Sequence, residues 1–420
     1  MVHHRDEVFA MGSNSKRGFW IAALPIVLLM GHTSFAQPAN NAPLAAPRVF
    51  LYDGTMLAKL KSSDASDPRR QEVVRAAKAA ADKAMTEGPF AVTQKAVTPP
   101  SGDKHDYMSQ APYFWPDPTK PNGLPYIRRD GEHNPELKKI SDHDEFGKMG
   151  DDSRALALAY YLTGNQAYAD RAALLLRTWF LDPATKMNPN LEFGQGIPGI
   201  NTGRGIGIIE SRSLLGATEA VGLLAGSKTW TAADEQGIKA WMTAYLNWMR
   251  TSQKGKDEDA AKNNHGTWYD LQVTDLALFL GDRQLAVDTL ERVKTRRITQ
   301  IDPDGRQPLE TARTNGWGYS NGNLDGLTQL ATLGERVGVD LWDYKTPDGR
   351  SIRGAIDFLL PYAIAGKKWD YQQIGGFHAS DLEHSLERAA VAYHDPKYAA
   401  AAAQIRGNME DLPTVILASN

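Results

Sequence analysis

The sequence predicts an all-α fold, an α/α toroid in which helical hairpins follow one another around a closed ring. From Asp151 onward, apolar residues recur at helical spacing almost throughout the chain. Several pairs of apolar segments are joined by short turns, as in helical hairpins. The pairs recur irregularly, with long Gly-rich and aromatic insertions between them, whereas an α-solenoid would show a fixed short period. A toroid with a cleft and long functional loops at one rim is therefore favoured over a solenoid.

The first 36 residues are expected to be a signal peptide and not part of this fold. A basic start, an apolar run and small residues before the cleavage point identify such a segment: Lys16 and Arg17, Phe19 to Met30, then Ser34 and Ala36. Cleavage is expected after Ala36, which predicts a periplasmic or secreted protein. The apolar run is too short to be a membrane span, and no later segment is long and apolar enough to be one.

A lead-in and a first helix are expected next. Residues 37–66 are predicted to be an extended lead-in, because Gln37 to Arg48 is rich in Pro, Ala and Asn. Residues 67–420 are predicted to form a single α/α-barrel domain. Its first helix should run from Asp67 to Thr86, where apolar residues stand at helical spacing.

The remaining elements are mostly hairpins and single helices. Three hairpins are predicted, at Leu156–Leu162 with Tyr168–Trp179, Leu276–Leu280 with Leu285–Val293, and Ala389–Tyr393 with Tyr398–Ile405. Further helices are expected at Ile206–Leu224, Ala232–Met249, Leu324–Val337 and Ile352–Ile364. Four irregular stretches separate these helices: residues 88–135, 188–210, 263–269 and 310–320. Long ordered loops usually carry function, so the chemistry is expected there.

The composition limits the classes of function. The chain has no cysteine, which excludes thiolate zinc sites and cysteine nucleophiles. Its formal net charge is −3, whereas a nucleic-acid-binding protein is normally basic, so no nucleic-acid partner is expected. The 10 Trp and 15 Tyr residues are ample for platforms on which sugars stack, although large cores use them too. Nothing in the residues requires a partner chain, and a monomer is expected.

One set of residue types suits chemistry on an acidic sugar. A uronic-acid polymer can be cut by β-elimination, in which the C5 proton is removed and the C4–O4 bond breaks. Catalysis needs donors that neutralise the sugar carboxylate, a base beside C5 and an acid beside O4. An amide, an imidazole, a guanidinium and a phenol meet these needs without a metal: Asn264, His265, Arg313 and Tyr319.

The proton roles depend on the substrate, and plain structural roles compete with them. If C5–H and O4 share a face of the sugar, a Tyr319 phenolate favoured by nearby Arg313 could take the proton and return it to O4. If they lie on opposite faces, His265 is the natural base and Tyr319 the acid. Alternatively, an asparagine of Asn263-Asn264 caps a helix, Arg313 pairs with Glu310, and Tyr319 only packs under its loop.

These motifs resemble a known family. The stretches Asp106–Ser109, Pro112–Pro118, Gly123–Glu132, Asn263–Trp268 and Arg313–Tyr319 are similar to alginate lyases of the α/α-toroid type. The resemblance runs from about residue 100 to near the C-terminus, closest to polysaccharide lyase family 38 and more distantly to family 5. It implies a barrel of six to seven hairpins. It also implies that the amide and guanidinium neutralise the carboxylate while the imidazole and phenol transfer protons. The Arg-to-Tyr gap is one residue shorter than expected for family 5, so that family's substrate preference is not transferred.

A second group of side chains is predicted to bind the substrate. Aromatic residues could stack on sugars, arginines could pair with neighbouring carboxylates, and amides could bind hydroxyls. They are Tyr113, Trp115, Tyr126, Arg128, Arg129, Gln195, Asn201, Arg204, Asn263, Trp268 and Trp317, with Arg212 as a further arginine that could equally pair with Glu210. Core packing competes for each aromatic residue. His105, His133, His378 and His384 form no His-x-His or His-x-x-x-His pair, so neither a catalytic metal nor another cofactor is expected.

The sequence thus predicts a polysaccharide lyase for β-1,4-linked uronate polymers, with mannuronate-rich alginate as its substrate. A glucuronan lyase of the same mechanism remains an alternative. A helical-barrel glycoside hydrolase would instead use two carboxylates, for which Asp302, Asp304, Glu310 and Asp325 are available. A non-catalytic glycan-binding protein is the third alternative.

Overall fold

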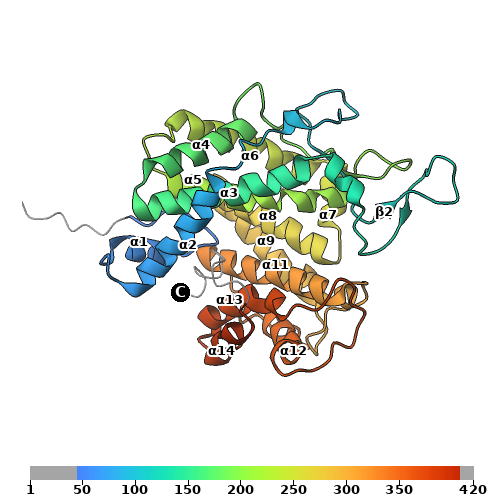
Figure 1. Ribbon diagram of the computed structural model, residues 1–420. Coiled ribbons are helices and arrows are strands. Elements are labelled where there is room, and N and C mark those ends of the chain that lie inside the picture. The colour runs from blue at the N-terminus through green and yellow to red at the C-terminus, as the bar shows by residue number, and fades with distance from the viewer. Residues whose placement is uncertain (1–44, 407–420) are drawn as a thin grey trace, which may run out of the picture. The chain divides into compact units, whose positions relative to one another are not determined.

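A computed structural model describes residues 45–406, in which fourteen α-helices dominate (Figure 1). The predicted signal peptide lies outside the described residues. The helices are α1 Gly54–Ser62, α2 Pro68–Ala84, α3 Asp142–Thr163, α4 Gln166–Phe180, α5 Leu214–Leu224, α6 Ala232–Thr251, α7 Gln253–Asp259, α8 Asn264–Leu280, α9 Arg283–Arg296, α10 Pro308–Thr311, α11 Gly316–Val337, α12 Ile352–Ile364, α13 Glu383–Tyr393 and α14 Pro396–Ile405. The all-α prediction is therefore confirmed for this part of the chain.

The three predicted hairpins are present as α3–α4, α8–α9 and α13–α14. The first two turn at Gly164 and Gly281, whose φ angles of 73° and 83° favour glycine. Asn165 and Asp282 then cap the second helix of each pair, because their side chains accept from its first backbone N–H groups. The same turn chemistry that predicted the hairpins therefore closes them.

The lead-in differs from the prediction. Residues 54–62 form helix α1, so an extended segment over 37–66 is wrong there. The backbone N–H groups of Phe50, Leu51 and Tyr52 all donate to the buried carboxylate of Glu219 on α5. Leu57 is fully buried in the main core. The composition of Gln37 to Arg48 does not reveal this structure, because the residues after it are ordered by hydrogen bonds to Glu219, which is distant in the sequence.

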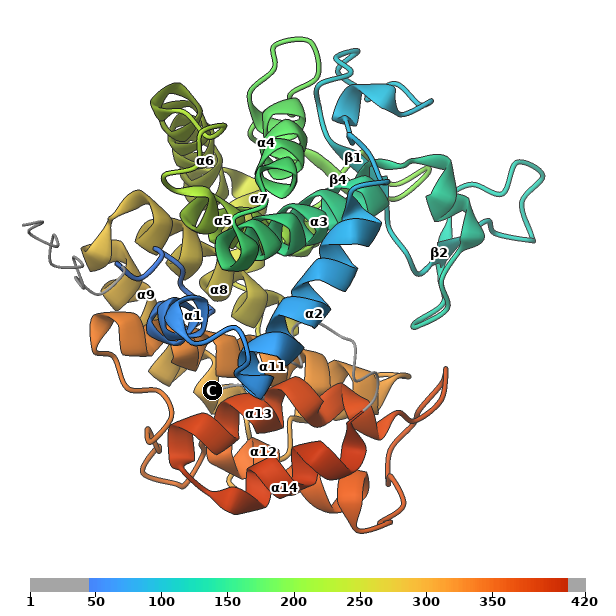
Figure 2. The same cartoon turned by 60° about the vertical axis from the view of Figure 1, so that its left-hand side comes forward.

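Two groups of helices make the core. Helix α3 packs against α2, α4 and α5, and α8 packs against α9 and α11 (Figure 2). Helix α5 also contacts α8, which joins the groups. Both α5 and α8 are buried along nearly their whole length, as central helices are. Helix α5 is largely apolar, whereas α8 also buries polar side chains such as Asp270, Gln272 and Asp275. None of the described helices is both long enough and apolar enough to cross a membrane.

Very short strands order the first two irregular stretches, called here the first insertion (residues 88–135) and the second insertion (residues 188–210). Strand β1 Met108–Gln110 pairs in parallel with β4 Phe193–Gly196, which ties the first insertion to the second. Strand β2 Phe114–Trp115 pairs antiparallel with β3 Ile127–Arg128 and makes a hairpin that projects from the helices (Figure 1). The helix predicted at Ile206–Leu224 starts as a 3₁₀ helix, η3 Gly205–Ser213, and becomes α-helical only at α5.

The last two insertions are not loops as predicted. Helix α8 begins at Asn264, and Arg313 stands between the short helix α10 and the start of α11 at Gly316. The glycine-rich start of α11 has weak helix propensity, but the side chain of Gln373 accepts a hydrogen bond from the backbone of Trp317. The residues predicted to carry chemistry are therefore held on or beside the first turns of two helices.

Candidate active site

One large cavity, of about 1110 Å³, opens where α8, α11, η3 and the first insertion meet. Its lining includes all four residues predicted to be catalytic: Asn264, His265, Arg313 and Tyr319. It also includes six of the predicted substrate-binding residues, namely Tyr113, Arg128, Gln195, Arg204, Asn263 and Trp268. Side chains from all four irregular stretches of the sequence thus converge on one groove.

Asn264 is held by a carboxylate behind it. Its backbone N–H donates to Oε1 of Glu310 at 2.6 Å, and its side-chain Nδ2 donates to Oε2 of the same residue at 2.7 Å. Glu310 is buried, and burial raises its pKa above the usual value, opposed by the two hydrogen bonds from Asn264. The amide orientation is thereby fixed, and the second hydrogen on Nδ2 stays available. Neither Asn263 nor Asn264 caps α8 through its side chain.

His265 follows on the same turn and has its own carboxylate partner. Nδ1 lies 2.8 Å from Oε1 of Glu258 on α7. The Glu258 side chain is fully buried, whereas 17% of the His265 side chain is exposed, toward the cavity that it lines. Among the described residues, Nε2 of His265 has no hydrogen-bond partner.

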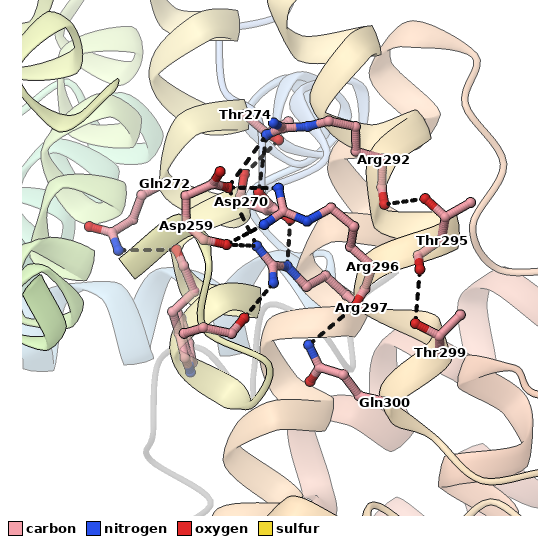
Figure 3. Close-up of polar contacts among 12 residues, drawn as sticks. Asp259, Asp270, Gln272, Thr274, Arg292, Thr295, Arg296, Arg297, Thr299 and Gln300 are labelled. Atoms are coloured by element: carbon pink, nitrogen blue, oxygen red, sulfur yellow. Dashed lines mark hydrogen bonds and ion pairs between the residues drawn. The ribbon is translucent and has the colours of Figure 1, made fainter. Parts of the chain in front are cut away.

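A buried ion pair supports the start of α8 from below (Figure 3). Nε of Arg297 donates to Asp270 at 2.7 Å, and its two terminal nitrogens donate to the carbonyl oxygens of Ala261 and Asp259 at 2.6 and 2.9 Å. These carbonyls belong to the segment that leads into Asn263. A Cβ on Gly266 would lie 2.2 Å from both the Ala261 oxygen and the Arg297 guanidinium, so only glycine fits there.

Arg313 and Tyr319 form a second polar group in the cavity. Arg313 Nη2 donates to the Tyr319 hydroxyl at 2.8 Å, and that hydroxyl donates to the Tyr113 hydroxyl at 2.6 Å. Arg313 also binds Asp130 through Nε and Nη2, at 3.0 and 2.7 Å. This hydrogen bonding lowers the pKa of Asp130 to about 2. Arg313 thus pairs with Asp130 of the first insertion, and the alternative pairing with Glu310 is wrong.

The phenolate form expected at Tyr319 is not favoured by the surroundings of its hydroxyl. Burial raises the pKa of Tyr319 well above its usual value, and the hydrogen bond to Tyr113 raises it further. The Arg313 guanidinium acts in the opposite direction but is weaker, since Asp130 already neutralises it. Tyr319 therefore carries its proton here, which suits a proton donor.

Three arginines surround the cavity. Arg204 donates to the backbone and side-chain oxygens of Gln195, and burial lowers its pKa to about 10. Arg128 is exposed and pairs with Asp130 at 2.7 Å. Arg212 lies over the Trp268 ring at 5.6 Å. Glu210 binds Tyr107 and Ser109, so the predicted alternative of an Arg212–Glu210 pair is wrong. No carboxylate of the described residues neutralises Arg212.

Five predicted substrate-binding residues do not line the cavity: Trp115, Tyr126, Arg129, Asn201 and Trp317. Trp317 is fully buried and donates to the His378 carbonyl, so sugar stacking by its ring is wrong and the competing core role is correct. Trp115 donates to the Glu132 carbonyl and lies under the Arg129 guanidinium. Trp115 thus holds parts of the first irregular stretch together.

The partner carboxylates are the main residues that sequence reasoning misses. Asp130 stands 183 positions from Arg313, and Glu310 stands 46 positions from Asn264. The sequence points to Glu310 only as a partner of Arg313 or as a hydrolase carboxylate. Spacing carries no signal for such pairs, because the fold alone brings them together.

The carboxylates available to a hydrolase are arranged otherwise. Glu310 holds Asn264, Asp302 binds Arg306, and Asp325 binds Arg388. None of them, nor Asp304, lines the cavity. Within residues 45–406, no three His, Asp or Glu side chains are grouped so that they could hold a metal ion.

Comparisons with known proteins agree with this arrangement. A crystal structure of an alginate lyase from Bacteroides ovatus is 40% identical, with a TM-score of 0.84 over 88% of this chain and 99% of that chain. A variant of alginate lyase A1-III in complex with a tetrasaccharide is 19% identical, with a TM-score of 0.55 over 90% of this chain and 98% of that chain. No curated protein matches the sequence significantly.

Both structures share the helical toroid fold with this chain, so the predicted fold class is confirmed. The family described as alginate lyase matches residues 91–369, which is more than half of the sequence. These residues include helices α8 and α11 and every residue that lines the cavity except Asp381. The protein belongs to the alginate lyase family and is a polysaccharide lyase.

Proposed function

We propose that this protein cleaves mannuronate-rich alginate by β-elimination in the cavity described above. The observation that carries the proposal is the convergence of an amide, an imidazole, a guanidinium and a phenol from Asn264, His265, Arg313 and Tyr319. Membership of the alginate lyase family supports the reaction class.

Neutralisation of the sugar carboxylate falls to Asn264 and Arg313. Glu310 occupies one hydrogen of the Asn264 amide, which leaves the other to donate to a substrate oxygen. Arg313 is bound through Nε and Nη2, while Nη1 has no partner among the described residues. Donors that are already oriented stabilise the developing dianion without reorganising during the reaction.

Proton transfer falls to His265 and Tyr319. The protonated phenol of Tyr319 donates to O4 as the C4–O4 bond breaks and the C4=C5 bond forms. Because elimination also removes a proton from C5, a proton acceptor is needed, and Nε2 of His265 is proposed to be that acceptor. On mannuronate, whose C5–H and O4 share a face, His265 takes the phenol proton of Tyr319, and the resulting phenolate removes the C5 proton and returns it to O4. On a sugar with C5–H and O4 on opposite faces, His265 takes the C5 proton directly and Tyr319 protonates O4. In both routes the free imidazole is the proton acceptor.

The proposed preference for mannuronate over guluronate is supported by the positions of His265 and Tyr319. His265 and Tyr319 both lie on first turns, of the neighbouring helices α8 and α11. Groups from adjacent helix ends favour an approach to one face of the sugar. In β-1,4-linked mannuronate, C5–H and O4 lie on the same face of the ring, whereas in guluronate they lie on opposite faces.

Neighbouring sugars carry one carboxylate each, and the cavity offers them cations. Arg212 and Arg204 are proposed to bind these carboxylates, while Arg128 is already shared with Asp130. Trp268 lies on α8, the helix that also carries Asn264 and His265, and its ring packs against Arg212. This ring is proposed to contact a sugar.

We also propose that the protein is exported and acts as a monomer. The basic and apolar pattern that ends at Ala36 supports export. Mass spectrometry of the mature protein is expected to give an N-terminus at Gln37, and sedimentation is expected to give a single-chain mass. An intact leader or a stable dimer would contradict the respective proposal.

The function is tested by incubating the protein with polymannuronate, polyguluronate and polyglucuronate and following ultraviolet absorbance from the new C4=C5 bond. The fastest rise is expected with polymannuronate. The Tyr319→Phe variant is expected to lose about 10²- to 10⁴-fold in turnover. Tyr126→Phe is the matched control, since that hydroxyl binds Glu136 outside the cavity.

Each alternative has its own outcome. A preference for polyguluronate overturns the mannuronate proposal, and a preference for polyglucuronate indicates a glucuronan lyase. Products with saturated ends indicate a hydrolase. Binding without turnover on all three polymers indicates a glycan-binding protein.

A further inference from the structure

A buried carboxylate stands directly behind the imidazole that lines the cavity. The Glu258 side chain is fully buried, and its Oε1 lies 2.8 Å from Nδ1 of His265. Its other oxygen, Oε2, is also buried and has no hydrogen-bond partner among the described residues. A carboxylate that is this poorly solvated and has one oxygen unpaired is costly, so an ordinary structural role is a weak explanation for it.

Helix α7 cannot easily move this carboxylate away. A Cβ on Gly255 would lie 1.6 Å from the Met249 carbonyl, and one on Gly205 would lie 2.6 Å from the Lys254 carbonyl. Both sides of α7 therefore lie in direct backbone contact with their neighbours, α6 and η3. Glu258 is consequently presented to His265 at a fixed distance.

The start of α8 does not depend on Glu258 for its position. Glu310 holds the backbone and side chain of Asn264, and Arg297 holds the carbonyls of the preceding segment. What Glu258 adds is contact with one ring nitrogen of His265. A carboxylate is an acceptor, so it selects the tautomer with the proton on Nδ1.

We propose that Glu258 is a positioning residue that keeps the proton of His265 on Nδ1 and thereby presents the lone pair of Nε2 to the cavity. This inference rests on the proposed function, in which Nε2 is the proton acceptor. Once Nε2 has taken a proton, the imidazole carries a positive charge that the adjacent carboxylate stabilises. Glu258 therefore acts on the reaction through His265 and touches no substrate.

Other charged groups also face this imidazole and set the background for a pH test. Glu310 on α10 interacts with His265, Arg204 interacts with Glu258, and Arg212 and Arg313 line the same cavity. Arginine keeps its charge over any practical pH range, and Glu310 is unchanged in a Glu258 variant. A difference between the wild type and that variant hence reports Glu258 alone.

The test uses Glu258→Gln in the full-length protein, with Asp257→Asn as the control because Asp257 is exposed on the same helix. The tautomer is read from ¹⁵N NMR of histidine-labelled protein, with the His265 signals assigned by their absence in His265→Ala. We expect the wild type to carry its proton on Nδ1 and Glu258→Gln to show a mixture of tautomers. Asp257→Asn is expected to match the wild type.

The activity readout is the pH profile of kcat/KM on polymannuronate. Loss of the carboxylate disfavours the protonated imidazole, so the acidic limb is expected to move to lower pH in Glu258→Gln. Turnover at neutral pH should fall by about 10- to 100-fold, with KM changed less. An unchanged tautomer and pH profile would overturn the proposal.

The proposal stays testable if the variant does not fold or the protein is not a lyase. A wild-type His265 with its proton on Nε2 overturns it without any variant. If no polyuronate is cleaved, the proposed function fails, while the NMR measurement still decides whether Glu258 sets the tautomer.

Discussion

The buried Arg297–Asp270 pair allows a quantitative test of what supports the candidate site. Arg297 is 1% exposed, Asp270 is fully buried, and the guanidinium also binds two carbonyls below the start of α8 (Figure 3). We predict that Arg297→Met, which keeps most of the apolar volume, destabilises the protein and weakens catalysis together. In the variant the Ala261 carbonyl loses its side-chain donor, and the Asp270 carboxylate keeps only the longer side-chain contact of 3.4 Å from Arg292. The Asp259 carbonyl keeps Arg296 as a donor.

The expected decrease in the free energy of unfolding follows from the loss of these contacts. Removing one partner of a buried ion pair costs about 3–5 kcal/mol. Burial raises the pKa of Asp270 and Arg297 opposes this effect, so the loss of Arg297 favours the neutral acid, which limits the cost. An unfolding entropy of about 2.1 cal/mol/K per residue over residues 45–406 then gives a drop in Tm of roughly 4–7 °C.

Differential scanning calorimetry near neutral pH measures this change, with Arg296→Met as the matched control. Arg296 neighbours Arg297 and binds Asp259, but 31% of its side chain is exposed. Partly exposed pairs contribute about 1 kcal/mol or less, so its Tm should change by roughly 1 °C. Equal changes in the two variants would refute the reasoning. A destabilised Arg297→Met with full turnover would show that the pair stabilises the fold without positioning the site.

Three further predictions concern the cavity and its surroundings. Gly266→Ala places a methyl group 2.2 Å from a carbonyl oxygen and a guanidinium. The free energy of unfolding should therefore fall by about 1–3 kcal/mol, and turnover should drop. The control Gly147→Ala has open space around its Cβ and should be neutral or stabilising in the same calorimetric scan. Arg313 lowers the pKa of Asp130 to about 2, so the Arg313–Asp130 pair is complete above about pH 4 and is lost as pH falls toward 2. Limited proteolysis should then cut the first insertion faster at low pH. The Asp130→Asn variant should show the same sensitivity already at neutral pH. Arg212→Gln should raise KM for polymannuronate about 10-fold with an unchanged Tm, and an unchanged KM would remove Arg212 from the proposed substrate contacts.

Much of the fold is predictable from local sequence signals. Turn residues such as Gly164 and Gly281 and caps such as Asn165 and Asp282 mark the hairpins directly. Elements held mainly by tertiary contacts are not predictable in this way. Helix α1 follows a segment whose N–H groups bind Glu219, and the first turn of α11 contains two glycines.

In the candidate site, too, some residues are predictable from the sequence and others are not. Residue chemistry and motif resemblance are sufficient to name the four side chains that converge, because β-elimination demands those functional groups. Their partners Glu258, Glu310 and Asp130 could not be named, since only the folded chain brings them into contact. Aromatic content misleads at Trp317, because a tryptophan that fills the core and one that stacks on a sugar look alike in sequence.

The central claim is that one sugar carboxylate is bound by Asn264 and Arg313 while the phenol of Tyr319 faces O4 of the same sugar. A crystal structure of Tyr319→Phe with a mannuronate tetrasaccharide tests this most directly, because the inactive variant should retain the intact ligand. The prediction is a carboxylate within hydrogen-bond distance of the Asn264 amide and the Arg313 guanidinium, with the substituted aromatic ring beside the uncleaved linkage. A tetrasaccharide seated elsewhere, or one whose carboxylates meet neither residue, would contradict the account.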